Sequence, residues 1–285
     1  MKLKFEYIKV CMRLRVLTFS LFLAFFAGPG WAESILINTP TDFRLQAQWF
    51  KSSNMRKPAI IALHGCSGLY RTDETTLQNR YREYVERLNL AGYHVLLPDS
   101  FRSRGSSSIC SIKNSERNID TEDRREDVLA ALEWLRQQPE VDPERIALLG
   151  WSHGAMTVLS AINARRPFYT RGVAGAVVFY PGCRESLQNE ILVQTPLLME
   201  LAENDDWTTP GPCIELARRL SQSGATVSLH VYANSYHGFD GSAPVRFRRD
   251  IPNGMFAQGT HVGGNPLARE QALAELDAFF WRIFQ

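Results

Sequence analysis

The sequence predicts an α/β domain in which a mostly parallel β-sheet is flanked by helices on both faces. Two observations support this prediction. Short apolar runs bounded by turn residues alternate along the chain with segments of helical periodicity. Most of these short runs are apolar throughout, which is typical of parallel strands because they are buried on both faces. The 253 residues after position 32 are enough for one large domain of this class.

Residues 1–32 are predicted to be a secretory signal peptide. Five basic residues precede a run of 12 weakly polar to apolar residues at 16–27, and the small residues Gly30 and Ala32 stand at the −3 and −1 positions of a cleavage site before Glu33. A membrane anchor is the alternative, but 12 apolar residues are fewer than the about 20 that span a bilayer. We therefore expect a periplasmic or secreted mature chain, 33–285, without a stable membrane anchor.

The charge of the mature chain argues against a nucleic-acid partner. Removing residues 1–32 leaves 27 basic and 29 acidic residues, a net charge of −2, and no basic stripe. Four cysteines remain, and an even number in an exported chain predicts two disulfides. No cluster of cysteine and histidine has the spacing of a zinc site, so we expect no metal.

The predicted elements alternate from residue 43 onward as one domain, 33–285, without a repeat, a linker or a large cap domain. Residues 43–49 alternate apolar with polar, as in a half-exposed strand near a sheet edge. The longest irregular stretches are 100–119 and 233–265. Further strands are expected at 58–65, 94–100, 145–150, 175–182, 195–206 and 226–232, and helices at 79–90, 120–138, 153–165, 214–223 and 266–284.

Four segments with reactive or polar residues follow predicted strands at their carboxyl ends, where sheets of this class place their sites. They are 64–68, 150–154, 203–206 and 236–239. The segment 150–154 reads Gly-Trp-Ser-His-Gly, and a chance match to G-x-S-x-G is expected in roughly one chain in ten of this length. Its position between a strand and a helix predicts that Ser152 is a nucleophile on a tight turn. A serine that only caps the following helix is the alternative.

A serine nucleophile needs a base and an acid that orients the base. His237 lies in a small, polar loop after the last predicted strand, which favours it as the base, and His261 is the rival candidate. Asp205 is favoured as the acid, which leaves Asp206 as a loop or helix-capping residue. The resulting order of serine, aspartate and histidine is that of α/β-hydrolases.

The loop after residues 58–65 is predicted to complete an oxyanion hole. Its donors are the backbone N–H groups of Cys66 and His153. Because such a loop must be rigid and its cysteines follow neighbouring predicted strands, we favour the disulfides Cys66–Cys110 and Cys183–Cys213 over other pairings or free thiols. Six residues could line a substrate pocket or pack in the core and rim: Tyr70, Phe101, Arg102, Trp151, Trp207 and Phe239.

Five segments carry a resemblance to a known family: LHGCSGLY at 63–70, LLGWSHGA at 148–155, LAENDDWTTP at 201–210, SYHGFD at 235–240 and GGNPLAREQALAELDAFF at 263–280. Together they resemble the dienelactone hydrolase family of the α/β-hydrolase superfamily, in its exported bacterial branch. The resemblance covers most of 40–284. It implies the α/β-hydrolase fold with an eight-stranded sheet, no cofactor, and hydrolysis of an ester or lactone through an acyl-enzyme.

Two features differ from the founding members of that family, which use a cysteine nucleophile and bind a substrate carboxylate with arginines. Ser152 stands at the nucleophile position, which favours ordinary ester chemistry. Gly241 stands at one arginine position, although Arg102 and Arg104 lie near the other. Dienelactone itself is therefore not the expected substrate.

We expect an exported serine hydrolase that acts on a small-molecule ester or lactone. A polyester hydrolase or acyltransferase with the same catalytic residues is one alternative. A binding protein with this fold is another, and a missing catalytic residue type would indicate it. All three residue types are present. The composition indicates no macromolecular partner.

Overall fold

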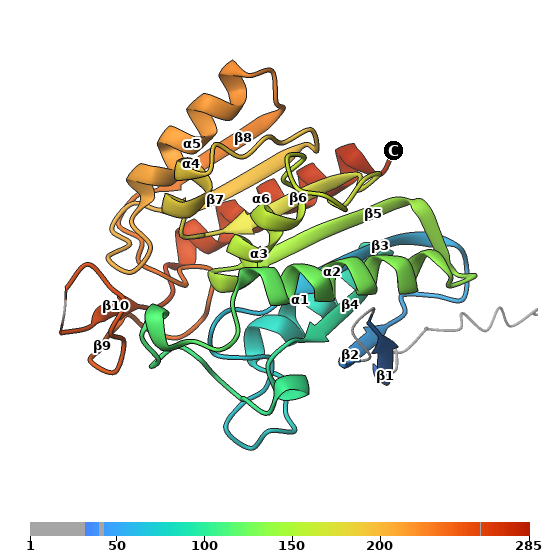
Figure 1. Cartoon of the computed structure of the whole chain (residues 1–285), viewed down its shortest axis with the longest axis horizontal. Helices are drawn as coiled ribbons and strands as arrows, with labels where there is room; N and C mark the ends of the chain where they lie inside the picture. Colours follow the sequence, from blue (N-terminus) through green and yellow to red (C-terminus); the bar gives the residue numbers. More distant parts are fainter. Residues whose placement is uncertain (1–31, 40–42, 257) are drawn as a thin grey trace, which may run out of the picture.

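The computed structural model describes residues 32–39, 43–256 and 258–285. The predicted signal peptide lies outside these residues, except for Ala32. The described chain forms an eight-stranded sheet in the order β1-β2-β4-β3-β5-β6-β7-β8, with helices on both faces (Figure 1). β2 pairs antiparallel with β1 and β4, and all other neighbours in this sheet are parallel. The predicted fold class, a mostly parallel sheet between helices, is confirmed.

The elements of the large sheet and its helices follow one another in chain order. The strands are β1 Ala32–Asn38, β2 Arg44–Phe50, β3 Lys57–Leu63, β4 His94–Asp99, β5 Val141–Trp151, β6 Gly175–Phe179, β7 Leu197–Ala202 and β8 Val227–Tyr232. The α-helices are α1 Asn79–Leu90, α2 Thr121–Arg136, α3 His153–Ala161, α4 Arg184–Gln188, α5 Pro210–Gln222 and α6 Pro266–Ile283. Two 3-10 turns, Arg102–Arg104 and Asn114–Glu116, and a small hairpin of β9 Arg246–Arg248 and β10 Thr260–Val262 lie in the irregular stretches.

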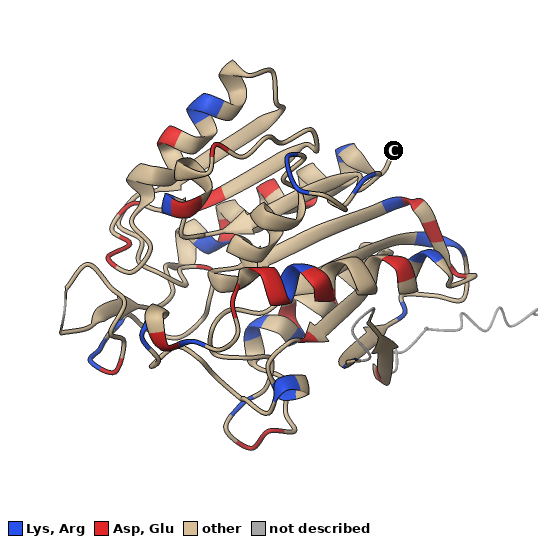
Figure 2. Cartoon of the chain, viewed as in Figure 1, with Lys and Arg blue, Asp and Glu red and all other residues tan. Residues whose placement is uncertain are grey.

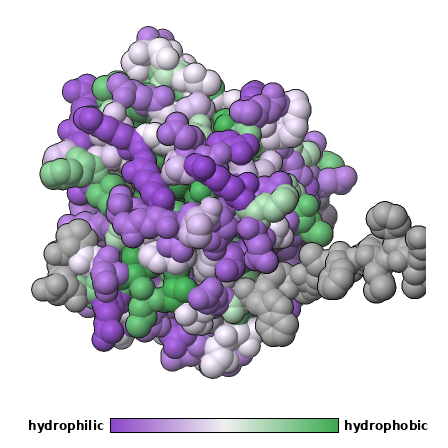
Figure 3. Space-filling model, turned by 90° about the vertical axis from the view of Figure 1, so that its right-hand side faces the viewer, coloured by the Kyte–Doolittle hydropathy of each residue, from purple (hydrophilic) through white to green (hydrophobic). Residues whose placement is uncertain are grey.

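Two large apolar clusters form the core, one on each face of the sheet. The first packs α2, α3 and α5 against one face, and the second packs α1 and α6 against the other. β3 and β4 are buried on both faces, as their continuous apolar sequences predict. On the face shown in Figure 3, apolar residues lie in small groups between polar ones.

A third, smaller cluster ties the two long irregular stretches to the sheet. In this cluster Cys66, which follows β3, packs with residues of both stretches. They are Phe101, Ile109 and Ile119 of 100–119 and Ile251 of 233–265. Asn253 also binds the first stretch, because its side chain donates to the carbonyl of Ile112 at 2.8 Å. These contacts hold both stretches beside the carboxyl ends of the parallel strands.

The sheet differs from the prediction at both edges. β1 was not predicted, because Ile37 is its only fully buried residue and its sequence carries little periodicity. The last predicted strand, which we expected at 226–232 and to be buried like the others, is β8, an edge strand in which Tyr232 alone is buried. The hairpin of β9 and β10 falls within a stretch that we expected to be irregular.

Two helices have boundaries that differ from those predicted. α3 was expected to extend to about residue 165 but ends at Ala161. The side chain of Asn163 accepts hydrogen bonds from the backbone N–H groups of Arg165 and Leu192, which turns the chain away from the helix axis. α5 begins at Pro210, before the predicted start at residue 214, because proline is favoured in the first helical turn.

One buried carboxyl group in the core should make stability depend on pH. Glu200 of β7 is fully buried on the face covered by α6. Among the described residues neither carboxylate oxygen has a hydrogen bond of normal geometry, although the Tyr232 hydroxyl interacts with the carboxylate and opposes part of the effect of burial. Burial raises the pKa of Glu200 to about 8. Between the ordinary pKa and this value only the unfolded state loses its proton, so the free energy of unfolding falls as the pH rises through this range.

Glu200→Gln should remove this loss of stability at high pH. Between pH 5 and pH 8 the variant should gain on the order of 3 kcal/mol in the free energy of unfolding relative to the parent protein. Urea unfolding at several pH values measures this difference. The exposed residue Glu270 on α6 provides the control Glu270→Gln, which should follow the parent protein. A stability difference between Glu200→Gln and the parent that is the same at every pH would contradict the prediction.

Candidate active site

The turn between β5 and α3 presents Ser152 at the carboxyl edge of the sheet. Ser152 has φ +51° and ψ −115°, a left-handed conformation that residues other than glycine rarely adopt. Its backbone N–H donates to the carbonyl of Phe179 in β6 at 2.9 Å, which holds the turn against the neighbouring strand. A strained serine between a central strand and a helix is the geometry of a nucleophile on a tight turn.

Both glycines of Gly-Trp-Ser-His-Gly are required by close packing. A Cβ atom at Gly154 would lie 2.1 Å from the carbonyl oxygen of Leu63. A Cβ at Gly150 would lie 2.5 Å from the carbonyl oxygen of Gly154. The turn therefore packs directly against the end of β3 at Gly154, and it is folded too tightly on itself to accept a side chain at Gly150.

Ser152, His237 and Asp205 form a continuous chain of hydrogen bonds. Oγ of Ser152 lies 3.0 Å from Nε2 of His237, and Nδ1 of His237 lies 2.8 Å from Oδ2 of Asp205. All three residues are buried. The carboxylate of Asp205 also accepts hydrogen bonds from the backbone N–H groups of Trp207 and Thr208, at 2.9 and 2.8 Å. The sequence-predicted nucleophile, base and acid therefore lie together, although they come from three separate loops.

The imidazole of His237 lies between two aromatic rings. The ring centroids of Tyr180 and Trp207 are each 4.6 Å from that of His237. Thr208 adds a polar contact, because its Oγ1 lies 3.1 Å from Nδ1 of His237 and 3.0 Å from Oδ2 of Asp205. These contacts restrict the rotation of the imidazole and keep one nitrogen toward each partner.

Asp206 and His261 form a second pair that is separate from Ser152. Nδ1 of His261 lies 2.7 Å from Oδ2 of Asp206, and the Asp206 carboxylate also accepts from Thr260 and from the backbone N–H of His261. Of the two roles predicted for Asp206, the loop role is observed, since it lies in the loop between β7 and α5. The helix-capping role is not, since α5 has no side-chain cap. Asp206 instead fixes strand β10, and the hydroxyl of Ser152 has no contact with His261.

A buried carboxylate that the sequence analysis did not assign supports the His237 loop. Asp240 accepts hydrogen bonds from the hydroxyls of Tyr84 and Tyr180, at 3.0 and 2.7 Å, and from the indole of Trp151 at 3.0 Å. The guanidinium of Arg80 lies 3.1 Å from the same carboxylate. Asp240 is three residues after the histidine in the SYHGFD segment, and this spacing was the only sequence signal for it.

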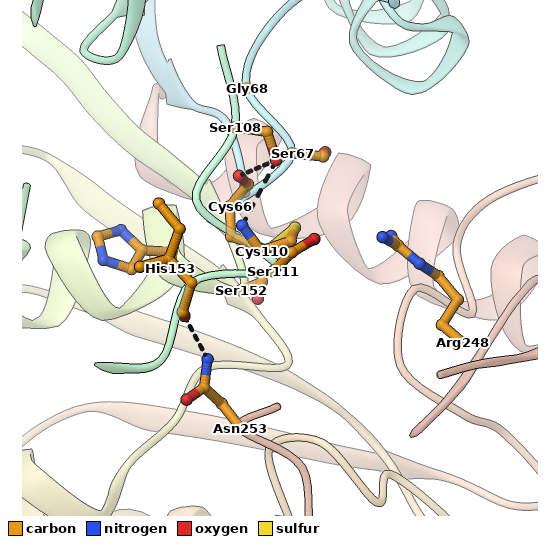
Figure 4. The surroundings of a disulfide bond; sticks show 12 residues. Cys66, Ser67, Gly68, Ser108, Cys110, Ser111, Ser152, His153, Arg248 and Asn253 are labelled. Carbon is orange, nitrogen blue, oxygen red and sulfur yellow. Dashed lines mark hydrogen bonds between the residues drawn. A yellow bond between two sulfur atoms is a disulfide. The ribbon is translucent and has the colours of Figure 1, made fainter. Parts of the chain in front are cut away.

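The two residues that carry the predicted oxyanion donors, Cys66 and His153, line the same cavity as Ser152. Within the described ranges, no acceptor is found for the backbone N–H of Cys66 or of His153. The carbonyl of Cys66 accepts from the backbone N–H of Ile109 at 2.9 Å, and its side chain forms a disulfide with Cys110. Figure 4 shows this disulfide beside Ser152 and His153. The loop is therefore tethered while its N–H group remains available.

Both disulfides that we favoured are present in the structure. Cys66–Cys110 joins the loops after the neighbouring strands β3 and β4. Cys183–Cys213 joins the loop after β6 to α5, the helix that follows the acid loop. Each bridge therefore constrains a loop next to the Ser152 site.

A cavity of about 660 Å³ opens above Ser152. Its walls come from both irregular stretches, from α3 and α4, and from the segment around Trp207. The described lining is mixed in character, with charged, amide and thioether side chains beside the indole of Trp207 and the imidazole of His153. The polar and apolar side chains that set this character are Asn114, Arg117, Met156, Arg184, Glu185, Gln188, Trp207, Asn253 and Met255.

The structure corrects most of the predicted pocket residues. Trp207 lines the cavity, but Phe101, Trp151 and Phe239 are fully buried in the core. Arg102 and Tyr70 stack on each other, with 4.7 Å between the guanidinium and the ring centroid, and neither lines the cavity. These aromatic side chains pack beneath the site, because they fill the space between the sheet and the segments that cover it.

The described residues contain no group of three or more histidine, cysteine, aspartate or glutamate side chains arranged to hold a metal ion. None of the helices in this part of the chain has the length and apolar character needed to cross a bilayer.

The chain is similar to known proteins both in sequence and in fold. The sequence model of the protein family described as "Dienelactone hydrolase family" matches residues 45–283 of this chain. A protein of Bradyrhizobium sp named "Probable 2-oxo-3-(5-oxofuran-2-ylidene)propanoate lactonase" is 22% identical over 192 residues, which cover 65% of this chain and 74% of the relative.

Two solved structures are similar in fold at low sequence identity. The dienelactone hydrolase-like promiscuous phosphotriesterase P91 from metagenomic libraries has a TM-score of 0.66 and 16% identity, and the match covers 90% of this chain and 100% of P91. Thermogutta terrifontis esterase 2, phosphorylated by paraoxon, has a TM-score of 0.64 and 16% identity, covering 88% and 94% of the two chains.

Proposed function

We propose that this chain, which belongs to the dienelactone hydrolase family and is a carboxylic ester hydrolase, cleaves small-molecule esters or lactones through an acyl-enzyme on Ser152. The observation that carries the proposal is the chain of hydrogen bonds from Ser152 through His237 to Asp205, at 3.0 and 2.8 Å. It supplies a nucleophile, a base and an orienting acid at one end of the cavity.

The proposed reaction has two steps. Nε2 of His237 accepts the proton of Ser152 as Oγ bonds to the substrate carbonyl carbon, and the carbonyl electrons move to its oxygen. This oxyanion accepts hydrogen bonds from the N–H groups of Cys66 and His153. The intermediate collapses to an acyl-enzyme when His237 protonates the leaving alcohol. Water, deprotonated by His237, then releases the acid in the same manner.

Asp205 has an electrostatic role in this scheme. Its Oδ2 receives the Nδ1–H of His237, so the lone pair of the neutral imidazole lies on Nε2 and faces Ser152. When His237 gains a proton, the carboxylate stabilises the imidazolium. Two backbone N–H groups keep the carboxylate in place throughout.

The cavity favours a small or medium substrate with polar groups. A volume of about 660 Å³ is typical of small-molecule sites, and the wall carries Arg117, Asn114 and Asn253 beside apolar Met156. Among the described residues of this wall, Trp207 is the only tryptophan, tyrosine or phenylalanine. A polyester chain is expected to need an open, aromatic-rimmed cleft, so the small-molecule substrate is preferred.

We also propose that the enzyme is exported. The basic and apolar segments of residues 1–32 support this location. The two disulfides support it independently, because such bonds persist in oxidising compartments.

A fluorophosphonate reaction tests the proposed nucleophile. The purified protein and its Ser152→Ala variant are treated with the reagent, and their intact masses are measured. We expect one phosphonyl adduct on the parent and none on the variant, because only an activated serine displaces fluoride. The parent's mass before treatment also tests export, since cleavage after Ala32 predicts a chain that starts at Glu33.

Two results would count against the proposal. A folded, oxidised parent that forms no adduct would favour a binding protein with this fold. An adduct of equal yield on Ser152→Ala would place the reactive residue elsewhere.

A further inference from the structure

Arg124 of α2 is a fully buried arginine behind the Ser152 turn. Figure 2 shows acidic and basic residues interspersed on the N-terminal half of this helix. The neighbouring Asp127 is also buried but pairs with Arg104 at 2.8 Å. Arg124 has no ion pair within the described residues, and its Nε has no hydrogen-bond partner there. The buried carboxylates of Asp127 and Asp99 attract Arg124 electrostatically, but neither forms an ion pair with it. Burying a cation without a direct ion pair costs free energy, which raises the question of what this side chain does.

The two terminal nitrogens of Arg124 reach both sides of the predicted oxyanion hole. Nη1 lies 2.9 Å from Nδ1 of His153, and Nη2 donates to the carbonyl oxygen of His64 at 2.8 Å. His153 carries one of the proposed oxyanion donors. His64 is two residues before Cys66, which carries the other. One rigid guanidinium therefore links both donor segments.

Of the three buried side chains of Arg124, His64 and His153, only that of Arg124 is charged. Burial and the neighbouring Arg124 hold the pKa values of His64 and His153 well below the usual range, so both imidazoles are neutral. Burial lowers the pKa of Arg124 to about 10, which still leaves it protonated at neutral pH. Because guanidinium nitrogens only donate, Nδ1 of His153 is the acceptor and its proton lies on Nε2.

The surroundings keep the guanidinium in one orientation. Its central carbon lies 5.0 Å from the ring centroid of Phe101, which is fully buried. The loop that Arg124 binds is held at two further points. The backbone N–H of Gly65 donates to the hydroxyl oxygen of Tyr81 at 2.9 Å, and Cys66 is bridged to Cys110. The charge is therefore fixed before any substrate binds, as electrostatic stabilisation in a dry site requires.

We propose that Arg124 is a positioning residue for the oxyanion hole, which aligns the donors of Cys66 and His153 and places a buried positive charge behind them. The inference rests on the proposed function, because the oxyanion forms only when Ser152 adds to a carbonyl. The oxyanion of the tetrahedral intermediate then adds a negative charge that the positive charge of Arg124 stabilises. Arg124 itself transfers no proton and makes no bond to the substrate.

A trifluoromethyl ketone provides a readout that a merely structural residue would not change. An active serine adds to this ketone as a hemiketal, and NMR titration reports the pKa at which the hemiketal becomes an oxyanion. In Arg124→Met we expect this titration to move to higher pH. We expect kcat for an ester to fall on the order of 100-fold, while KM changes by less than about threefold.

Arg124→Lys separates charge from alignment. The ammonium keeps the positive charge but cannot donate in two fixed directions, so kcat should fall by about tenfold and the hemiketal titration should lie between those of the parent and Arg124→Met. This variant also decides the question if Arg124→Met does not fold. A lysine variant with parental kcat and parental hemiketal titration would then overturn the inference.

Arg269→Met is a matched control. Arg269 of α6 also has a buried Nε without a partner, but it pairs with Glu83 and does not line the Ser152 cavity. This variant should keep the parental hemiketal titration even if its melting temperature falls. If the hemiketal titrates at the same pH in the parent and in a folded Arg124→Met variant, the inference is overturned but the proposed function is not. A parent that forms no hemiketal would overturn the proposed function and the inference with it.

Discussion

His237→Ala should lower kcat/KM for an ester substrate by about 10⁴-fold or more. The imidazole is the only base in contact with the Ser152 hydroxyl among the described residues, at 3.0 Å. Without it the serine keeps its proton, and no group protonates the leaving alcohol. Steady-state hydrolysis of a chromogenic ester measures the loss, and near-parental circular dichroism would show that the variant is folded.

His261→Ala is the control for this prediction. His261 is also paired with a carboxylate, at 2.7 Å, and it was the rival base in the sequence analysis. Its ring packs between Tyr236 and Phe247, and its partner is Asp206, which fixes strand β10. We expect kcat/KM to stay within about threefold of the parent, because a surface side chain away from the reacting atoms has a small effect. A large loss in His261→Ala with parental activity in His237→Ala would reverse the assignment.

The order of the strands explains why the residues of the site were predictable from the sequence. Ser152 and His237 follow β5 and β8, and Asp205 follows β7, so parallel pairing brings all three loops to one edge of the sheet. Periodicity and turn residues are local signals that determine such elements. Helix α1 was placed at its observed limits because Gly92, at φ +89°, ends it.

The cavity wall could not be predicted in the same way. Asn114, Arg117 and Asn253 belong to stretches without periodicity, and their positions depend on contacts between segments more than 100 residues apart, such as that of Asn253 with Ile112. The aromatic residues chosen instead, such as Phe239, are fully buried. Aromatic character indicates burial at least as well as it indicates a pocket, and the sequence does not separate the two.

The buried polar residues that support the site were missed for a related reason. Asp240 and Arg124 are charged, and charged residues are usually exposed. Their partners come from other elements, such as Tyr84 of α1 for Asp240 and His153 of α3 for Arg124. A polar residue that is satisfied only by tertiary contacts leaves no pattern in its own segment.

Asp205→Asn should lower kcat by about 10³- to 10⁴-fold with little change in KM. The amide has nearly the shape of the carboxylate, so the fold should be retained. Its nitrogen would donate to Nδ1 of His237, which places the imidazole proton on Nε2, facing Ser152. The histidine could then no longer accept the serine proton, and the developing imidazolium would lose its counter-charge.

Asp206→Asn distinguishes the two adjacent carboxylates, since it makes the same chemical change one residue away. Asp206 contacts His261 and Thr260 rather than His237, so its loss should loosen strand β10 and lower the melting temperature while kcat falls by less than about tenfold. Parallel measurement of kcat and thermal unfolding for both variants separates catalysis from stability. If Asp206→Asn lost more activity than Asp205→Asn while both remained folded, Asp206 would be the acid. The hydrogen bond of 2.8 Å between Asp205 and His237 would then have no catalytic consequence.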